Sequence, residues 1–184
     1  MKRLLALVAL VAATTVTALA DPTNDLKNAM INLSKASAFH MTASAQGHTM
    51  EGDWVRPDKM HISAGPMEMI VIEKTTYIKM GGSWRQFSMP GTDRIMAPLN
   101  NAQAFAEKAK SNPNINVSDL GMKTVDGTAY HAYLVKDSDG SGSATTVYVD
   151  ANGYPARMDV TDTHGTQSVT FSNFNGPITI VAPI

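Results

Sequence analysis

The feature that most constrains the fold is an alternation of apolar and polar residues in short runs. Within residues 38–46, for example, Phe39 and Met41 alternate with His40 and Thr42. A period of two is typical of a β-strand with one apolar and one polar face. Similar runs recur along most of the chain, with Gly, Pro, Asn or Asp between them. The pattern predicts about ten or eleven short strands.

The connections between these runs indicate how the strands pair. Asp126-Gly127 lies between two extended runs, which is a strong signal for a tight hairpin. Residues 150–153 and His164-Gly165 are further short turns. Connections this short join antiparallel neighbours, because parallel strands need a long crossover. We therefore expect one large antiparallel sheet.

Two stretches have helical periodicity instead. The first covers residues 23–36, with Thr23 or Asn24 as its expected cap and an apolar stripe formed by Leu26, Ala29, Met30 and Leu33. The second covers residues 99–110. The apolar face of a sheet has to be covered, and these helices are the cover that the sequence offers. The sequence predicts an α+β fold in which a large antiparallel sheet curves around two or more helices.

The first 20 residues have the layout of a secretory signal peptide. Lys2 and Arg3 precede an apolar run over residues 4–19, and Ala18-Leu19-Ala20 offers small residues for cleavage. A membrane anchor is the alternative, but about 16 apolar residues fall short of the ~20 that span a bilayer. We expect residues 1–20 to be removed, residues 21–184 to form a single domain, and the product to be periplasmic or secreted.

Composition excludes several classes of protein. The chain of 184 residues has no cysteine, so it forms no disulfides and has no cysteine nucleophile. Its 15 basic and 16 acidic residues give a net charge of −1 and form no basic patch, so we expect no nucleic-acid partner. A hydrophobic share of 43% is too high for a disordered chain.

The sequence contains no recognisable catalytic or metal-binding motif. Its five histidines have none of the spacings of zinc sites, and no G-x-S-x-G is present. Gly81-Gly82-Ser83 is not followed by the lysine of a phosphate-binding loop. We expect no enzymatic activity, no metal and no cofactor. A site assembled from distant strands is the remaining alternative.

Methionine is the residue type that bears most on function. The chain has 12 methionines, and several fall on the apolar faces of predicted strands. Methionine is flexible and suits apolar surfaces that adapt to their ligands, but it also fills ordinary cores, and both interpretations stay open. From the alternation we place on a concave, ligand-binding face the residues Met41, Trp54, Met69, Val71, Ile78, Met158, Val160 and Phe171. An error of one residue in phase would turn any of them to the other face.

Four motifs occur in an order that resembles a known family. They are the RPDKM turn at residues 56–60, YIKMGGSW at 77–84, VDANGYPARM at 149–158 and PITIVAP at 177–183. Together with the short first helix they resemble the LolA-like periplasmic carriers of lipoproteins and lipids, particularly the mycobacterial-type lipid-carrying lipoproteins, over most of residues 23–183. The resemblance implies an open half-barrel, with helices on its concave side and an apolar cavity for acyl chains between them.

The resemblance also implies a function. We expect an exported carrier that binds lipid or the acyl chain of a lipoprotein without catalysis, as a monomer that exchanges its ligand with envelope donor or acceptor proteins. The chain lacks the acylated cysteine of the lipid-carrying lipoproteins, so it would be freely soluble. The alternative is an envelope stress-sensor or regulatory domain of the same fold that binds a protein partner.

Overall fold

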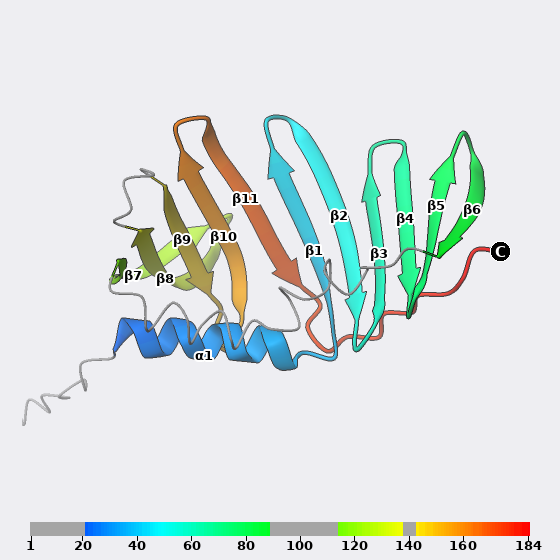
Figure 1. Ribbon diagram of the computed structural model, residues 1–184. Helices are drawn as coiled ribbons and strands as arrows, with labels where there is room; N and C mark the ends of the chain where they lie inside the picture. Colours follow the sequence, from blue (N-terminus) through cyan, green and yellow to red (C-terminus); the bar gives the residue numbers. More distant parts are fainter. Residues whose placement is uncertain (1–20, 89–113, 138–142) are drawn as a thin grey trace, which may run out of the picture.

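The structure is a computed structural model, and it describes residues 21–88, 114–137 and 143–184 (Figure 1). The signal peptide predicted at residues 1–20 and the helix predicted at 99–110 lie outside these ranges, so both stay predictions. The described chain forms one helix and one sheet of eleven strands. The strands are β1 (Ala38–Ala45), β2 (His48–Val55), β3 (Lys59–Ala64), β4 (Met67–Ile72), β5 (Thr75–Met80), β6 (Ser83–Ser88), β7 (Ile115–Val125), β8 (Thr128–Asp137), β9 (Ala144–Val149), β10 (Pro155–Asp162) and β11 (Gly165–Ser172).

The sheet is antiparallel throughout, and its order is β6-β5-β4-β3-β2-β1-β11-β10-β9-β8-β7. Two meanders, β1–β6 and β7–β11, are therefore joined where β1 pairs with β11. Strands β6 and β7 lie at opposite ends and do not pair, so the sheet is an open, curved half-barrel. This arrangement confirms the predicted α+β class and strand number.

The β7–β8 hairpin shows why the short turns were recognisable. Asp126 has φ of 51° and Gly127 has φ of 79°. Positive φ at both central residues is the geometry of the two-residue turn that matches the twist of antiparallel strands, and Asp-Gly favours it. The sequence signal and the observed turn therefore coincide.

Helix α1 (Pro22–Lys35) confirms the first predicted helix within one residue at each end. The expected cap was wrong: Asp21 is the N-cap, and its side chain accepts a hydrogen bond from the Thr23 backbone N–H at 3.0 Å. Pro22 begins the helix because its fixed φ suits the first turn and its missing N–H would have had no partner there.

Helix α1 crosses the lower ends of the strands from β8 to β1 (Figure 1). Ala29 and Leu33 are its buried residues. The Asn32 side chain donates to the Gly153 carbonyl oxygen in the β9–β10 turn at 2.9 Å. At the end of the helix, Arg56 Nε donates to the Ala36 carbonyl oxygen at 2.8 Å. Two turns that are distant in sequence thus hold the helix against the sheet.

The two faces of the sheet differ. Leu33 and Ala36, at the end of α1, pack against one face of the sheet, which we call the inner face. The sheet residues in their cluster are Phe39, Trp54, Met60, Ile62, Val71 and Phe171. The outer face carries most of the ionic pairs and a smaller apolar cluster. In that cluster Ile178 and Ile180, from the segment after β11, pack against Ile70 and Tyr77. The chain's last residues thus cover part of the outer face.

Candidate functional site

The strand register places the eight predicted site residues on the inner face. Met41 lies opposite Phe171, and Met69 lies opposite Ile78. Directly opposed residues of antiparallel strands project to the same face, and every second residue along a strand shares that face. The register of all the strands involved thus puts on the inner face Met41, Trp54, Met69, Val71, Ile78, Met158, Val160 and Phe171.

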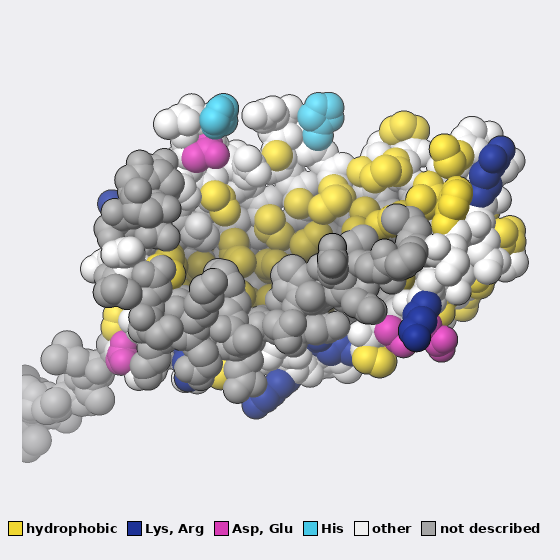
Figure 2. Space-filling model, viewed as in Figure 1, with side chains coloured by type: hydrophobic (Ala, Val, Ile, Leu, Met, Phe, Trp, Pro, Cys, Tyr) yellow, Lys and Arg dark blue, Asp and Glu magenta, His cyan; other side chains and the backbone are white. Residues whose placement is uncertain are grey.

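Six of these residues come together in one cluster, and two lie farther out. Trp54, Val71 and Phe171 are buried members of the main core, and partly buried Met41, Met69 and Met158 pack against it. Ile78 and Val160 are half-buried on the same face. Figure 2 shows hydrophobic side chains gathered in a hollow over this face. Whether the set binds a ligand stays a prediction.

Large side chains fill the lower end of the inner face. Phe39 is fully buried and stacks on Trp54 with ring centroids 5.5 Å apart, while the edge of Phe171 meets Phe39 at 5.9 Å. Met60 is also fully buried. Phe39 and Met60 follow from the same alternation as the predicted residues, but they were not among them.

Small side chains open the upper end of the same face. Ala43, Ala45 and Ala64 line a hollow of about 250 Å³ together with Met50 and Val169. The hollow lies near the β1–β2 and β10–β11 turns, and His48 and Gln167 stand at its polar border. The sequence contains this signal as alanines at apolar positions, but only the register brings strands β1, β2, β3 and β11 to one place.

Two buried polar atoms of the inner face have no hydrogen-bond partner among the described residues. They are Trp54 Nε1 and Thr76 Oγ1. Trp54 is 4% exposed and Thr76 is 0% exposed. A buried polar group without a partner costs roughly 1–3 kcal/mol, so each of these atoms lowers the stability of the folded protein. Thr76 was not predicted, because threonine is an ordinary strand residue and nothing in the sequence of β5 marks its hydroxyl as buried.

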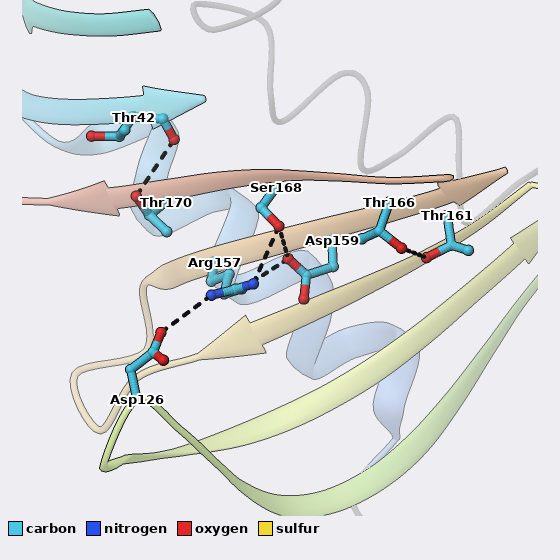
Figure 3. A network of polar contacts seen from close by, with 8 residues as sticks. All are labelled: Thr42, Asp126, Arg157, Asp159, Thr161, Thr166, Ser168 and Thr170. Carbon is cyan, nitrogen blue, oxygen red and sulfur yellow. Dashed lines mark hydrogen bonds and ion pairs between the residues drawn. The ribbon is translucent and has the colours of Figure 1, made fainter. Parts of the chain in front are cut away.

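Several charges on the outer face are paired with one another. Arg157 Nε donates to Asp159 Oδ1 at 2.8 Å, Arg157 Nη2 donates to the Ser168 hydroxyl at 3.2 Å, and that hydroxyl donates to Asp159 at 2.7 Å (Figure 3). The hydrogen bond with Asp159 raises the pKa of Arg157 above its ordinary value. Closer to β6, Lys79 Nζ donates to Glu68 at 2.9 Å and, with a smaller contribution from His61, lowers the pKa of that carboxyl.

Tyr133 of β8 is a titratable residue that contacts helix α1. It is 4% exposed, and its hydroxyl donates to Asp25 Oδ2 of α1 at 3.4 Å. Burial, together with the negative charges of Asp25 and Asp119, raises the pKa of Tyr133 to about 12. The phenol therefore stays neutral at physiological pH and serves as a hydrogen-bond donor to the helix.

Two further findings concern the described ranges only. They contain no group of three or more His, Asp or Glu side chains arranged to hold a metal ion. No helix within them is long and apolar enough to cross a membrane.

Comparison with solved structures identifies the fold. No protein-family model and no curated protein matches the sequence. Lipoprotein LppX of Mycobacterium tuberculosis superposes with a TM-score of 0.64 at 12% identity, over 88% of this chain and 100% of LppX. LprF of Mycobacterium bovis superposes with a TM-score of 0.63 at 17% identity, over 88% and 96% of the two chains.

MucB has a similar structure but is longer. It superposes with a TM-score of 0.54 at 14% identity, and the match covers 88% of this chain and 60% of MucB. At identities this low, the similarities establish the fold and not the activity. They confirm the half-barrel fold that the sequence motifs implied.

Proposed function

We propose that the protein is a carrier that binds a lipid or an acyl chain on its inner face and releases it unchanged. The observation that carries this proposal is the continuous apolar face, which ends in a hollow of about 250 Å³ between strands that are distant in sequence. The eight residues of the predicted set, from Met41 to Phe171, would form the binding face together with the alanines of the hollow.

Burial of hydrocarbon is sufficient for such binding. Each CH₂ group removed from water contributes about 0.8 kcal/mol, so a chain of several carbons binds without any reactive residue.

The proposed place of action is the cell envelope. Cleavage after Ala20 would release an exported, freely soluble domain, because the chain has no cysteine for acylation. As a soluble monomer it would take its ligand from an envelope donor and deliver it to an acceptor.

The direct test is to extract the purified protein with organic solvent, identify the lipids by mass spectrometry, and titrate it with a fluorescent fatty acid. Val160→Glu places a charge on the inner face, and the adjacent Thr161→Glu places the same charge on the exposed outer face. We expect the first variant to weaken fatty-acid binding at least tenfold and the second to leave it unchanged. Absence of both extractable lipid and fatty-acid binding would reject the carrier function.

A second function, recognition of a protein partner, is supported by one comparison. A MucB structure in complex with MucA superposes on this chain with a TM-score of 0.51. Under this alternative, a pull-down from envelope extract would recover one partner in a stoichiometric amount, and the same preparation would contain no extractable lipid.

A further inference from the structure

A second pocket lies at the other end of β11 from the hollow of the inner face. The hollow includes Gln167 and Val169, whereas this pocket includes Ser172 and the residues that follow β11. Its volume is about 410 Å³. It forms where the segment after β11 meets the β9–β10 turn and the beginning of β8. The pocket is therefore separate from the hollow, although Phe171 of the inner face also lines it.

A small residue at an irregularity in β10 lines the pocket. The pairing of β9 and β10 shifts between Pro155 and Arg157, which leaves Ala156 in a bulge. A bulge interrupts the ladder and re-aims neighbouring side chains. Because the bulged residue is alanine and not a large side chain, space remains between the walls on either side.

Part of the pocket wall is aromatic. Tyr154 and Phe174 line the pocket and stack on each other, with ring centroids 4.2 Å apart and planes within 14°. Tyr130 lines it from the side of β8. The Tyr154 hydroxyl accepts a hydrogen bond from the Asn175 amide at 2.9 Å, which holds this ring in place. Such side chains present a flat apolar surface with a polar group at its end.

A carboxylate stands next to these rings in a fixed orientation. Asp150 Oδ1 accepts hydrogen bonds from the backbone N–H groups of Asn152 at 2.9 Å and Tyr154 at 2.8 Å. Asp150 Oδ2 has no hydrogen-bond partner among the described residues, and neither does the Asn152 side chain. Thr128 adds a hydroxyl to the lining. An acceptor, an amide and a hydroxyl thus surround a flat apolar surface.

We propose that this pocket binds a neutral sugar ring. A pyranose has apolar C–H faces that pack on aromatic rings, and its hydroxyl groups pair with carboxylate, amide and hydroxyl groups at its edge. No Lys or Arg is among the described residues that line the pocket, and Asp150 repels anions, so phosphate is disfavoured. An organic cation would interact with the Asp150 carboxylate and the aromatic rings, but it would form no hydrogen bond with the Asn152 amide or the Thr128 hydroxyl. The volume lies within the range of about 300–1,000 Å³ that is usual for small-ligand sites.

The test is titration of the protein with methyl glycosides of glucose, galactose, mannose and N-acetylglucosamine, followed by saturation-transfer NMR. Asp150→Asn keeps the Oδ1 acceptor that organises the turn and removes the negative charge. We expect it to weaken binding roughly tenfold, because a hydrogen bond to a charged acceptor contributes about that much. Tyr130→Ala should abolish binding, whereas Tyr130→Phe should retain most of it. Asp126→Asn is the control, since it removes a charge in the neighbouring turn outside the pocket.

A second arm distinguishes a free sugar from the headgroup of a lipid. Vesicles of phosphatidylcholine with or without monogalactosyl diacylglycerol are sedimented with the protein. Binding of free glycosides indicates a free saccharide, and binding only to the galactolipid vesicles indicates a headgroup. The proposal is overturned if sugar binds in neither form, if Asp150→Asn and Tyr130→Ala bind like the wild type, or if tetramethylammonium binds and sugars do not. Thermal unfolding of each variant verifies that it is folded.

Discussion

The indole ring of Trp54 lies directly over Gly52, two residues earlier on β2. A Cβ atom at residue 52 would come within 2.7 Å of Trp54 Cζ3 and 3.4 Å of its Cη2. Because glycine has no such atom, the ring lies close against the backbone and stacks on Phe39 with the planes 7° apart. The bottom of the inner face therefore depends on the smallest residue of β2.

Gly52→Ala should force the Trp54 ring away from the sheet. We expect a loss of about 1–3 kcal/mol in the free energy of unfolding, which is the usual cost of overpacking. Denaturant unfolding measures this loss. Trp54 emission, recorded in a Trp84→Phe background because the chain has 2 tryptophans, measures the displacement of the ring. Glu51→Ala, an exposed neighbour on the outer face, is the control. An unchanged stability and spectrum for Gly52→Ala would contradict the close approach.

Thr76→Val should stabilise the ligand-free protein. The change replaces a fully buried hydroxyl that has no described partner with a methyl group of similar size. Removing the cost of the unsatisfied group should raise the free energy of unfolding by about 1 kcal/mol. Thr75→Val, which lies on the outer face, should have a smaller effect in urea unfolding. A destabilised Thr76→Val variant would show that the hydroxyl is hydrogen-bonded in the folded protein.

Arg56→Met should loosen the end of helix α1. Arg56 Nε donates to the Ala36 carbonyl oxygen and Arg56 Nη2 donates to the Leu33 carbonyl oxygen at 3.3 Å. Methionine keeps the aliphatic stem but leaves these acceptors without their donor, so we expect a loss of roughly 1.5–3 kcal/mol. Hydrogen exchange at the last turn of α1 should accelerate. Arg85→Met, at an exposed position of β6, is the control, and equal effects of the two changes would argue against the capping role.

The stability of the protein should fall on acidification partly through Glu68. Its pKa is lowered first by the hydrogen bond from Lys79 and then by His61. A carboxyl with a lowered pKa in the folded state contributes stability above its unfolded pKa, and this stability is lost as the pH falls through the folded pKa. Lys79→Met should raise the Glu68 pKa in an NMR titration and reduce the acid dependence of urea unfolding. Lys74→Met, on an exposed turn residue, should change neither, and identical titrations for the two variants would refute the assignment.

Alternation alone predicted which side chains share a face. Met69 and Val71 on β4 and Met158 and Val160 on β10 all lie on the inner face, as their period of two indicated. This inference succeeds because a strand leaves each side chain only two directions, and burial selects one of them. The cap of α1 was missed for a local reason: the helix begins at Pro22, one residue earlier than expected, so Asp21 is the N-cap.

The pairing of β1 with β11 was beyond the reach of the sequence, because no short turn joins these two strands. The pairing of β1 with β11 brings Ala43 opposite Val169, and only this contact produces the hollow of the inner face. In the same way, the pocket that we propose binds a sugar ring forms only because Tyr130, Tyr154 and Phe174 come together from three segments of the chain. Local periodicity contains no information about such long-range partners.

The sequence by itself determined the strand periodicity, the positions of the hairpin turns and the division into an apolar and a polar face, because these follow from the conformations open to adjacent residues. The tertiary structure decided how the two meanders join, which carbonyl oxygens Arg56 binds, and where side chains leave space. Each of these depends on atoms that are far apart in the chain and that meet only when the inner face is buried.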